Sequence, residues 1–276
     1  MELITSRRNP LVARLRALHQ PRGRREQGLL LLEGTHLLQE VRRLGLQPER
    51  ILATPAWLER HDGLLPPGAP TVQPVSEEVL AAVATTEHPD GVVLTLPTAA
   101  LPQASGGGEG GGGFVLALDQ LQDPGNLGTL LRTALAAGVT EVWLAGGADP
   151  WQPKVLRASA GAALALPLRR EADRAALRPL LEGALSTGHQ LVATLVEGAA
   201  AGAEPPLPYW QLDWTRPTVL LLGNEGAGLH PELAALASQR VTIPHSTAVE
   251  SLNVAVAAGP LLLERWRQQC QRGRVP

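Results

Sequence analysis

The sequence has 276 residues, of which 44% are hydrophobic, and a formal net charge of −2. This length is sufficient for two domains of ordinary size, and the chain has no run of about 18 apolar residues that could cross a membrane. One cysteine and seven scattered histidines exclude an internal disulfide and offer no close set of metal ligands, so we expect no metal site.

The N-terminal segment is basic and lacks the apolar stretch of a signal peptide, so we expect a cytoplasmic protein. Its first 25 residues contain one acid, Glu2, and seven arginines: Arg7, Arg8, Arg14, Arg16, Arg22, Arg24 and Arg25. Such a basic cluster is typical of surfaces that contact nucleic acid. Because the chain has only one lysine, arginine richness is partly compositional, and an ordinary solvated helix is an equal alternative.

Residues 1–98 alternate between helical and strand patterns. An amphipathic helix begins near Asn9-Pro10, where the proline suits the first helical position. The other expected elements are strands over 28–33, 51–54, 72–75 and 91–96, and helices over 36–44 and 76–84. This alternation predicts a compact α/β domain.

Residues 99–113 are expected to form a linker. Seven of the eight positions 106–113 are glycine, which makes ordering in a core too costly in conformational entropy. A flexible segment of this kind would let the first domain swing relative to residues 114–276, which we assign to a second domain.

The second domain alternates regularly between strands and helices. We expect strands over 114–118, 141–145, 163–168, 190–194, 219–222 and 241–243, and helices over 127–137, 153–158 and 173–186, with a last long helix after residue 253. The strands are continuous apolar runs, which is typical of a parallel sheet covered on both faces. Residues 198–208 read as a low-complexity insertion, expected to be a mobile loop near the binding pocket.

Residues 218–258 combine several features of a binding site. An apolar strand ends at the loop 223–228, which has three glycines, an asparagine and a glutamate. A second strand ends at Pro244, and the Ser-Leu-Asn triplet 251–253 then opens a helix. Ligands of parallel sheets bind outside the carboxyl ends of the strands. Two ordinary glycine-rich turns are the alternative, but three glycines in six residues exceed what one turn requires. The order of these three glycines fits neither the dinucleotide-binding fingerprint nor the P-loop motif.

Asn126 and Arg132 follow the strand 114–118. We expect Asn126 at or just before a helix cap and Arg132 in the second turn, so that both face the strand ends. A guanidinium offers fixed planar donors that suit phosphate. A simple helix cap and a surface ion pair are the alternatives, but the apolar neighbours of Arg132 favour a functional role.

Three ordered motifs resemble those of the SpoU (TrmH-like) RNA ribose methyltransferases. They are Pro124-Gly125-Asn126-Leu127-Gly128 with Arg132-Thr133-Ala134, then Leu222 to Leu229, then Ile243-Pro244 with Val249 to Ala257. The first domain, with Leu31 to Gly34 and Thr86 to Val92, resembles the substrate-binding domain of many members. The sequence departs from the family at His245, where methionine is common, and at Ala255, where many members have serine.

The resemblance implies transfer of a methyl group from S-adenosylmethionine to a ribose 2′-hydroxyl, above all in rRNA. It implies an α/β fold in which a small RNA-binding domain precedes a parallel-sheet SPOUT-type domain with a deep trefoil knot. It also implies a homodimer formed through the catalytic domain. Methylation of tRNA, and RNA binding without catalysis on the same fold, are the alternatives.

The family's motifs assign roles to nine residues. The cofactor pocket would be lined by Thr194, Gly223, Ile243 and Leu252. The catalytic set would be Asn126, Arg132, Glu225, Ser251 and Asn253. Because a ribose hydroxyl is a poor nucleophile at neutral pH, a group must accept its proton or stabilise the alkoxide. The family's first-motif arginine, which matches Arg132, is assigned the proton-accepting role. A guanidinium stays protonated in proteins, which favours phosphate binding and alkoxide stabilisation instead. Asn126 would orient the hydroxyl, and Glu225 would fix the geometry.

Overall fold

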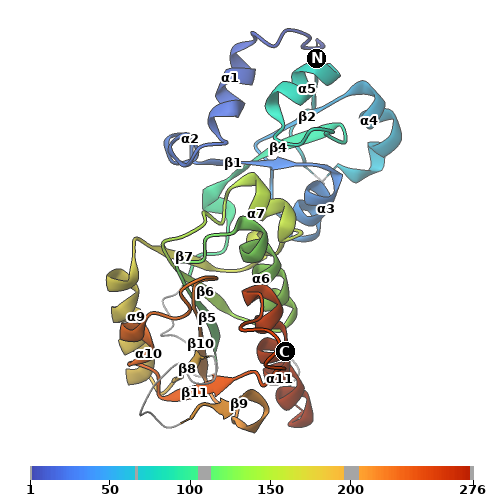
Figure 1. Cartoon of the computed structure of the whole chain (residues 1–276). Helices are drawn as coiled ribbons and strands as arrows, with labels where there is room; N and C mark the ends of the chain where they lie inside the picture. Colours follow the sequence, from blue (N-terminus) through green and yellow to red (C-terminus); the bar gives the residue numbers. More distant parts are fainter. Residues whose placement is uncertain (1, 66–67, 105–112, 196–204, 274–276) are drawn as a thin grey trace. The chain divides into compact units, whose positions relative to one another are not determined.

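The structure is a computed structural model that describes residues 2–65, 68–104, 113–195 and 205–273. The chain forms two compact units (Figure 1). Unit 1 contains Met1–Leu101 and Asp149–Ala165, and unit 2 contains Pro102–Ala148 and Leu166–Pro276. The division at residues 98 and 114 stays a prediction about domains, and the units differ from it in placing 149–165 with the N-terminal part. Most of the predicted linker (105–112) and of the predicted insertion (198–204) lies outside the described residues.

Unit 1 is built on a four-stranded sheet of order β1-β4-β2-β3, in which β4 runs antiparallel to β1 and β2. Its strands are β1 (Leu29–Glu33), β2 (Arg50–Ala53), β3 (Gln73–Pro74) and β4 (Val92–Pro97). Its helices are α1 (Pro10–Ala17), α2 (Pro21–Gln27), α3 (Thr35–Arg43), α4 (Pro55–His61), α5 (Glu77–Val83), α7 (Pro153–Ala158) and α8 (Ala162–Ala165), with the short 3-10 helices η1 (Asp62–Leu64) and η2 (Thr98–Ala100). The predicted α/β pattern is confirmed, whereas α2 and α4 were not predicted.

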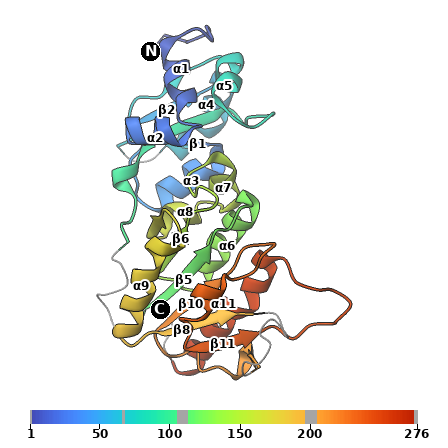
Figure 2. The same cartoon turned by 60° about the vertical axis from the view of Figure 1, so that its left-hand side comes forward.

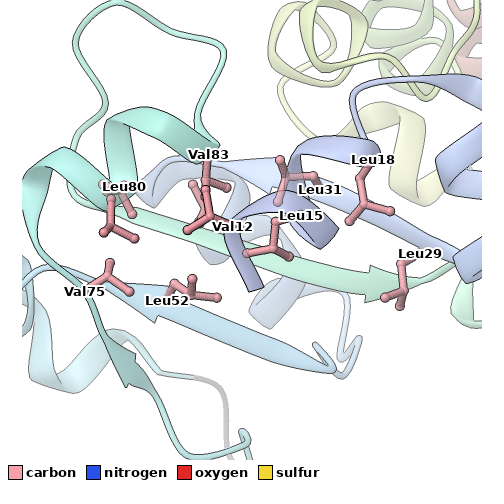
Figure 3. Close-up of a cluster of buried hydrophobic side chains, with 11 residues drawn as sticks. Val12, Leu15, Leu18, Leu29, Leu31, Leu52, Val75, Leu80 and Val83 are labelled. Carbon is pink, nitrogen blue, oxygen red and sulfur yellow. The ribbon is translucent and has the colours of Figure 1, made fainter. Parts of the chain in front are cut away.

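The core of unit 1 forms where α1 and α5 pack on the sheet (Figure 3). Asn9 caps α1 by accepting a hydrogen bond from the Leu11 N–H at 2.9 Å, as the sequence predicts. Leu15 then packs among the buried leucines and valines of β1, β2 and α5. Burying one such leucine contributes about 1.5–3 kcal/mol, so this cluster is what makes the unit compact.

Within unit 1, a buried ion pair connects the segment 149–165 to the N-terminal part of the chain. The Arg24 guanidinium bonds to the Asp149 carboxylate and donates to the carbonyl oxygens of Leu18 and His19 at 2.8 and 2.9 Å. Arg24 is only 4% exposed. Its predicted place in the surface basic cluster is therefore wrong, because this arginine neutralises a carboxylate and satisfies backbone carbonyls. The other six arginines are exposed.

Unit 2 contains a seven-stranded sheet of order β7-β6-β5-β10-β8-β11-β9, and all of its strand pairs are parallel. The strands are β5 (Phe114–Asp119), β6 (Glu141–Ala145), β7 (Leu168–Glu171), β8 (Gln190–Thr194), β9 (Leu207–Pro208), β10 (Thr218–Leu222) and β11 (Gln239–Thr242). The helices are α6 (Pro124–Ala136), α9 (Arg174–Ser186), α10 (Pro231–Ala234) and α11 (Val254–Gln271), with the 3-10 helix η3 (Tyr209–Gln211). Figure 2 shows β5, β10, β8 and β11 side by side in this unit.

Both faces of the second sheet are covered by helices. The helix α9 packs on β6 and β8, and α6 packs against α11. In Figure 1, α9 lies on one side of the strands and the pair α6 and α11 on the other. Every residue of β5 and β10 is buried, which confirms the parallel, doubly covered sheet expected from the continuous apolar runs.

The predicted strand over 163–168 is wrong. Residues 162–165 form the helix α8, and β7 begins only at Leu168, after Pro167. Periodicity alone cannot separate a short buried strand from a buried helical turn. The three alanines of this run favour a helix, since alanine has the highest helix propensity.

Candidate active site

The carboxylate of Glu225 joins the loop after β10 to the start of α6. Its oxygens accept hydrogen bonds from the backbone N–H groups of Asp123 at 2.9 Å and Gln122 at 3.1 Å. Partial burial raises the pKa of Glu225, but these N–H donors outweigh it and hold the pKa below the ordinary value. The carboxylate is therefore ionised at neutral pH.

Asn126 and Asn253 extend this network across the sheet edge. The Asn126 side-chain N–H donates to Glu225 at 3.3 Å, and its carbonyl oxygen accepts from the Asn253 Nδ2 at 3.0 Å. The Asn253 Oδ1 accepts from the N–H groups of Ala255 and Val256 and so caps α11. Three of the five predicted catalytic residues, which come from three separate motifs, thus form one continuous hydrogen-bonded chain.

The predicted position of Asn126 at or before the helix cap is wrong. Asp123 caps α6, and its carboxylate accepts from the Asn126 N–H at 2.7 Å. Pro124 then occupies the first helical position, where its missing N–H costs nothing. Asn126 therefore lies in the first turn, and its side-chain amide is available to bond to both Glu225 and Asn253.

Arg132 and Ser251 stand outside this hydrogen-bonded chain. Both residues are exposed, and neither side chain has a hydrogen bond or ion pair with any residue in the described part of the chain. The surface ion pair considered for Arg132 is therefore not formed within this part of the protein. An exposed guanidinium without a partner is available to an anionic ligand.

The loop 223–228 is a tight turn held by Asn224. The backbones of Asn224 and Gly228 exchange two hydrogen bonds of 3.0 Å, and the Asn224 side chain donates to the carbonyl of Gln120 at 2.8 Å. A Cβ on Gly223 would lie 2.1 Å from the Gly228 carbonyl carbon, so no side chain fits there. Gly223 is therefore required by the turn itself, whatever its role toward a ligand.

The residues predicted to hold the cofactor lie along one edge of the sheet. Thr194, Gly223 and Ile243 are at or just beyond the carboxyl ends of the neighbouring strands β8, β10 and β11, and Leu252 directly precedes the α11 cap. The Thr194 hydroxyl oxygen is buried and has no hydrogen-bond partner in the described part of the chain. A buried polar atom of this kind favours a ligand that pairs with it, so this edge fits a polar cofactor.

A buried carboxylate next to the site was not predicted. Asp119, at the end of β5, is 1% exposed, and it accepts from the Arg174 Nε at 2.6 Å and from the His230 N–H at 3.1 Å. These bonds connect β5 to the first residues of α9 and α10. The sequence does show an acid at the end of an apolar strand. Its bonding partners could not be predicted, because they lie far from it in the sequence.

Residues 113–263 match the SpoU rRNA Methylase family, and residues 9–94 match the MRM3-like substrate binding domain. The chain is 44% identical to an uncharacterized tRNA/rRNA methyltransferase of Synechocystis sp., over 96% of this chain and 94% of that protein. It is 31% identical to the 23S rRNA (guanosine(2553)-2′-O)-methyltransferase RlmP of Bacillus subtilis, over 95% of this chain and 98% of the relative. The AdoMet-bound rRNA methyltransferase from Sinorhizobium meliloti superposes with a TM-score of 0.79 and 32% identity, over 96% and 97% of the two chains. The sequence and the fold together place this chain in the SpoU rRNA methylase family.

Proposed function

We propose that this protein transfers a methyl group from S-adenosylmethionine to a ribose 2′-hydroxyl of rRNA. The observation that carries the proposal is the hydrogen-bonded chain Glu225, Asn126 and Asn253, since it joins three motifs at the carboxyl edge of a parallel sheet. The Bacillus subtilis relative is named for this reaction on 23S rRNA, and the Sinorhizobium meliloti structure contains AdoMet.

Each part of the site has a role in this reaction. Thr194, Gly223, Ile243 and Leu252 would hold the cofactor, which supplies an electrophilic methyl group when bound. The positively charged Arg132 guanidinium would hold the substrate phosphate and stabilise the alkoxide that forms as the hydroxyl releases its proton to water. Asn126 orients the hydroxyl, and the ionised Glu225 fixes the orientation of the Asn126 amide. Ser251 lies two residues before Asn253, the cap of α11, and belongs to the same catalytic set.

We infer further that the last segments form a deep trefoil knot and that the protein works as a cytoplasmic homodimer through the catalytic domain. Membership of the family supports the knot. Exposed apolar side chains on α11, Val256 and Leu263, support an intersubunit surface. Within the described residues no helix is long and apolar enough to cross a membrane.

Methyl transfer from tritiated S-adenosylmethionine to purified rRNA and tRNA tests the function. We expect labelling of rRNA at a ribose, recognised as a dinucleotide that resists alkaline hydrolysis because its 2′-oxygen is methylated. Arg132→Ala should abolish transfer while cofactor binding, measured by calorimetry, survives. Labelling of tRNA alone would favour the first alternative substrate, and cofactor-independent RNA binding without transfer would favour a non-catalytic protein.

A further inference from the structure

Unit 1 contains a cavity of about 300 Å³, a size at the lower end of the range for small-molecule sites. Three segments line it: the junction of β1 and α3, the loop between α5 and β4, and the helix α7. Its wall includes Glu33, Gly34, His36, His88, Asp90 and Arg157. The catalytic residues proposed above belong to unit 2, and none of them lines this cavity.

On the inner wall of the cavity, a carboxylate and a guanidinium are paired. Glu33 is buried and accepts hydrogen bonds from the backbone N–H and the hydroxyl of Thr85 at 3.0 and 2.6 Å. The Arg157 guanidinium lies 3.2 Å from the same carboxylate and donates to the Thr85 hydroxyl at 2.8 Å. Since the two charges pair with each other, neither is available to attract an ionic ligand.

Asp90 gives the cavity a preference for hydrogen-bond donors. Its Oδ2 accepts from the Thr35 N–H at the start of α3, at 2.7 Å, while its Oδ1 has no partner in the described part of the chain. Gly34, with a φ of +100°, allows the chain to turn here. Because a carboxylate already occupies the positive end of the helix, a phosphate would be repelled. A ligand with N–H groups would instead pair with the free oxygen.

Two exposed imidazoles, His36 and His88, complete the wall. Flat rings of this kind stack on unpaired bases in RNA-binding proteins. Guanine is a planar base, and its base-pairing edge presents two neighbouring N–H donors. Guanine fits this chemistry better than uracil, which offers a single N–H and two carbonyl oxygens.

We propose that this cavity binds one unpaired guanine of the RNA substrate, with the ring against His36 or His88 and the N–H edge on Asp90. The proposal rests on the proposed RNA substrate. It means that the N-terminal unit recognises a base in addition to the phosphate backbone.

Titration of the full chain with the trinucleotides ApGpA and ApUpA tests the proposal. The imidazole signals of His36 and His88 are followed by NMR, after assignment with the variants His36→Ala and His88→Ala. We expect ApGpA to shift these signals and to bind about tenfold more tightly than ApUpA, as one good base contact provides. Inorganic phosphate should shift neither signal.

Asp90→Asn is the decisive variant, because the amide keeps an acceptor for the Thr35 N–H but turns the free acceptor into a donor. We expect it to remove the preference for ApGpA. Glu87→Gln is the matched control: Glu87 is exposed in the same loop and is absent from the cavity wall, so the preference should persist. If Asp90→Asn fails to fold, the double variant His36→Ala, His88→Ala replaces it, since both side chains are exposed and their joint loss should weaken ApGpA binding several-fold.

Equal binding of both trinucleotides, or histidine signals that do not move, would overturn the cavity proposal. Methyl transfer to rRNA is measured on the same wild-type sample, so a failure of the proposed enzymatic function is distinguished from a failure of the cavity. A protein that methylates rRNA but ignores ApGpA contradicts only the cavity proposal. A protein that binds ApGpA in the cavity but transfers no methyl group contradicts only the enzymatic function.

Discussion

Asn253 has two tasks, since its Oδ1 caps α11 and its Nδ2 donates to Asn126. Asn253→Asp keeps the cap but places a carboxylate oxygen against the Asn126 carbonyl. We therefore expect a large loss of kcat with little change in thermal stability. Asn253→Ala should lose kcat and also about 0.5–2 kcal/mol of stability, measured by denaturant unfolding.

Asp173→Ala is the control for the cap. Asp173 caps α9 through the Ala176 N–H at 2.9 Å and has no bond to the Glu225 network. The variant should lose similar stability while keeping methyl transfer. Equal activity of Asn253→Asp and the wild type would contradict the role assigned to the amide.

The lowered pKa of Glu225 predicts a pH dependence of the hydrogen bonds that hold the loop. Because the folded-state pKa lies below the ordinary value of 4.5, the stabilisation is complete above that pH and disappears as the pH falls through the folded value. The amide NMR signals of Gln122 and Asp123 should therefore titrate together below pH 4.5. Glu225→Gln should remove this titration, and a midpoint above the ordinary value would contradict the assignment.

Among single residues, the sequence predicted which side chains of the site lie together better than it predicted the contacts that support them. Motif spacing was sufficient to select Glu225, Asn126 and Asn253. The bond from Asn224 to Gln120 could not be predicted, because its partners are about a hundred residues apart and Gln120 adopts a positive φ of 52°. The catalytic and cofactor-binding roles of all nine site residues stay predictions.

Among the elements, the turn after β10 allows a paired glycine test. A Cβ at Gly223 would lie 2.1 Å from backbone, whereas one at Gly226 would meet only the Asn224 Oδ1 at 3.7 Å. Gly223→Ala should cost at least about 1–3 kcal/mol through overpacking and should weaken cofactor binding. Gly226→Ala should resemble the wild type in thermal unfolding and calorimetry. Similar behaviour of both variants would show that the turn is not tightly packed in solution.

The helices α1 and α2 carry a basic surface that can be tested separately. Arg16 and Arg25 are exposed and have no side-chain partner among the described residues, so we expect them to bind RNA phosphates. The double variant Arg16→Ala, Arg25→Ala should lower rRNA affinity and reduce the salt slope by about 0.7–0.9 for each phosphate that is no longer neutralised. Arg178→Ala is the control, because Arg178 pairs with Glu182 on α9. An unchanged salt slope would leave α1 and α2 as an ordinary solvated surface.

The elements themselves were predictable where apolar patterns are long or caps are distinctive. The strands β5, β6, β8 and β10 lie where the sequence places them within one or two residues. The helices α2 and α4 were missed. The helix α2 has no apolar residue and no side-chain cap, whereas the equally short α5 is marked by the Ser76 cap.

At the scale of the whole molecule, family membership was predictable because three motifs keep their order. The association of residues 149–165 with unit 1 was not predictable, because it depends on packing between segments that are more than a hundred residues apart in the sequence. Val155 and Leu156 of α7 are buried there, and exposing them costs about 1.5–3 kcal/mol each.

This packing predicts the behaviour of truncated forms. Removal of residues 1–98 alone should give a protein that aggregates, because α7 and α8 lose their apolar partners. Removing 1–98 and also replacing 149–165 by a short polar segment should give a monodisperse protein that still binds S-adenosylmethionine. Size-exclusion chromatography and calorimetry provide the comparison. A well-behaved first form would show that the buried face of α7 is dispensable.

Between β6 and β7, the segment 149–165 belongs to unit 1. This arrangement limits how chimeras can be built from this protein and its relatives. A chimera that takes residues 1–101 from another family member at a single splice would pair the Asp149 segment of this chain with a foreign residue at position 24. A working hybrid therefore needs three crossovers, near residues 101, 148 and 166, so that the exchanged unit keeps both of its segments.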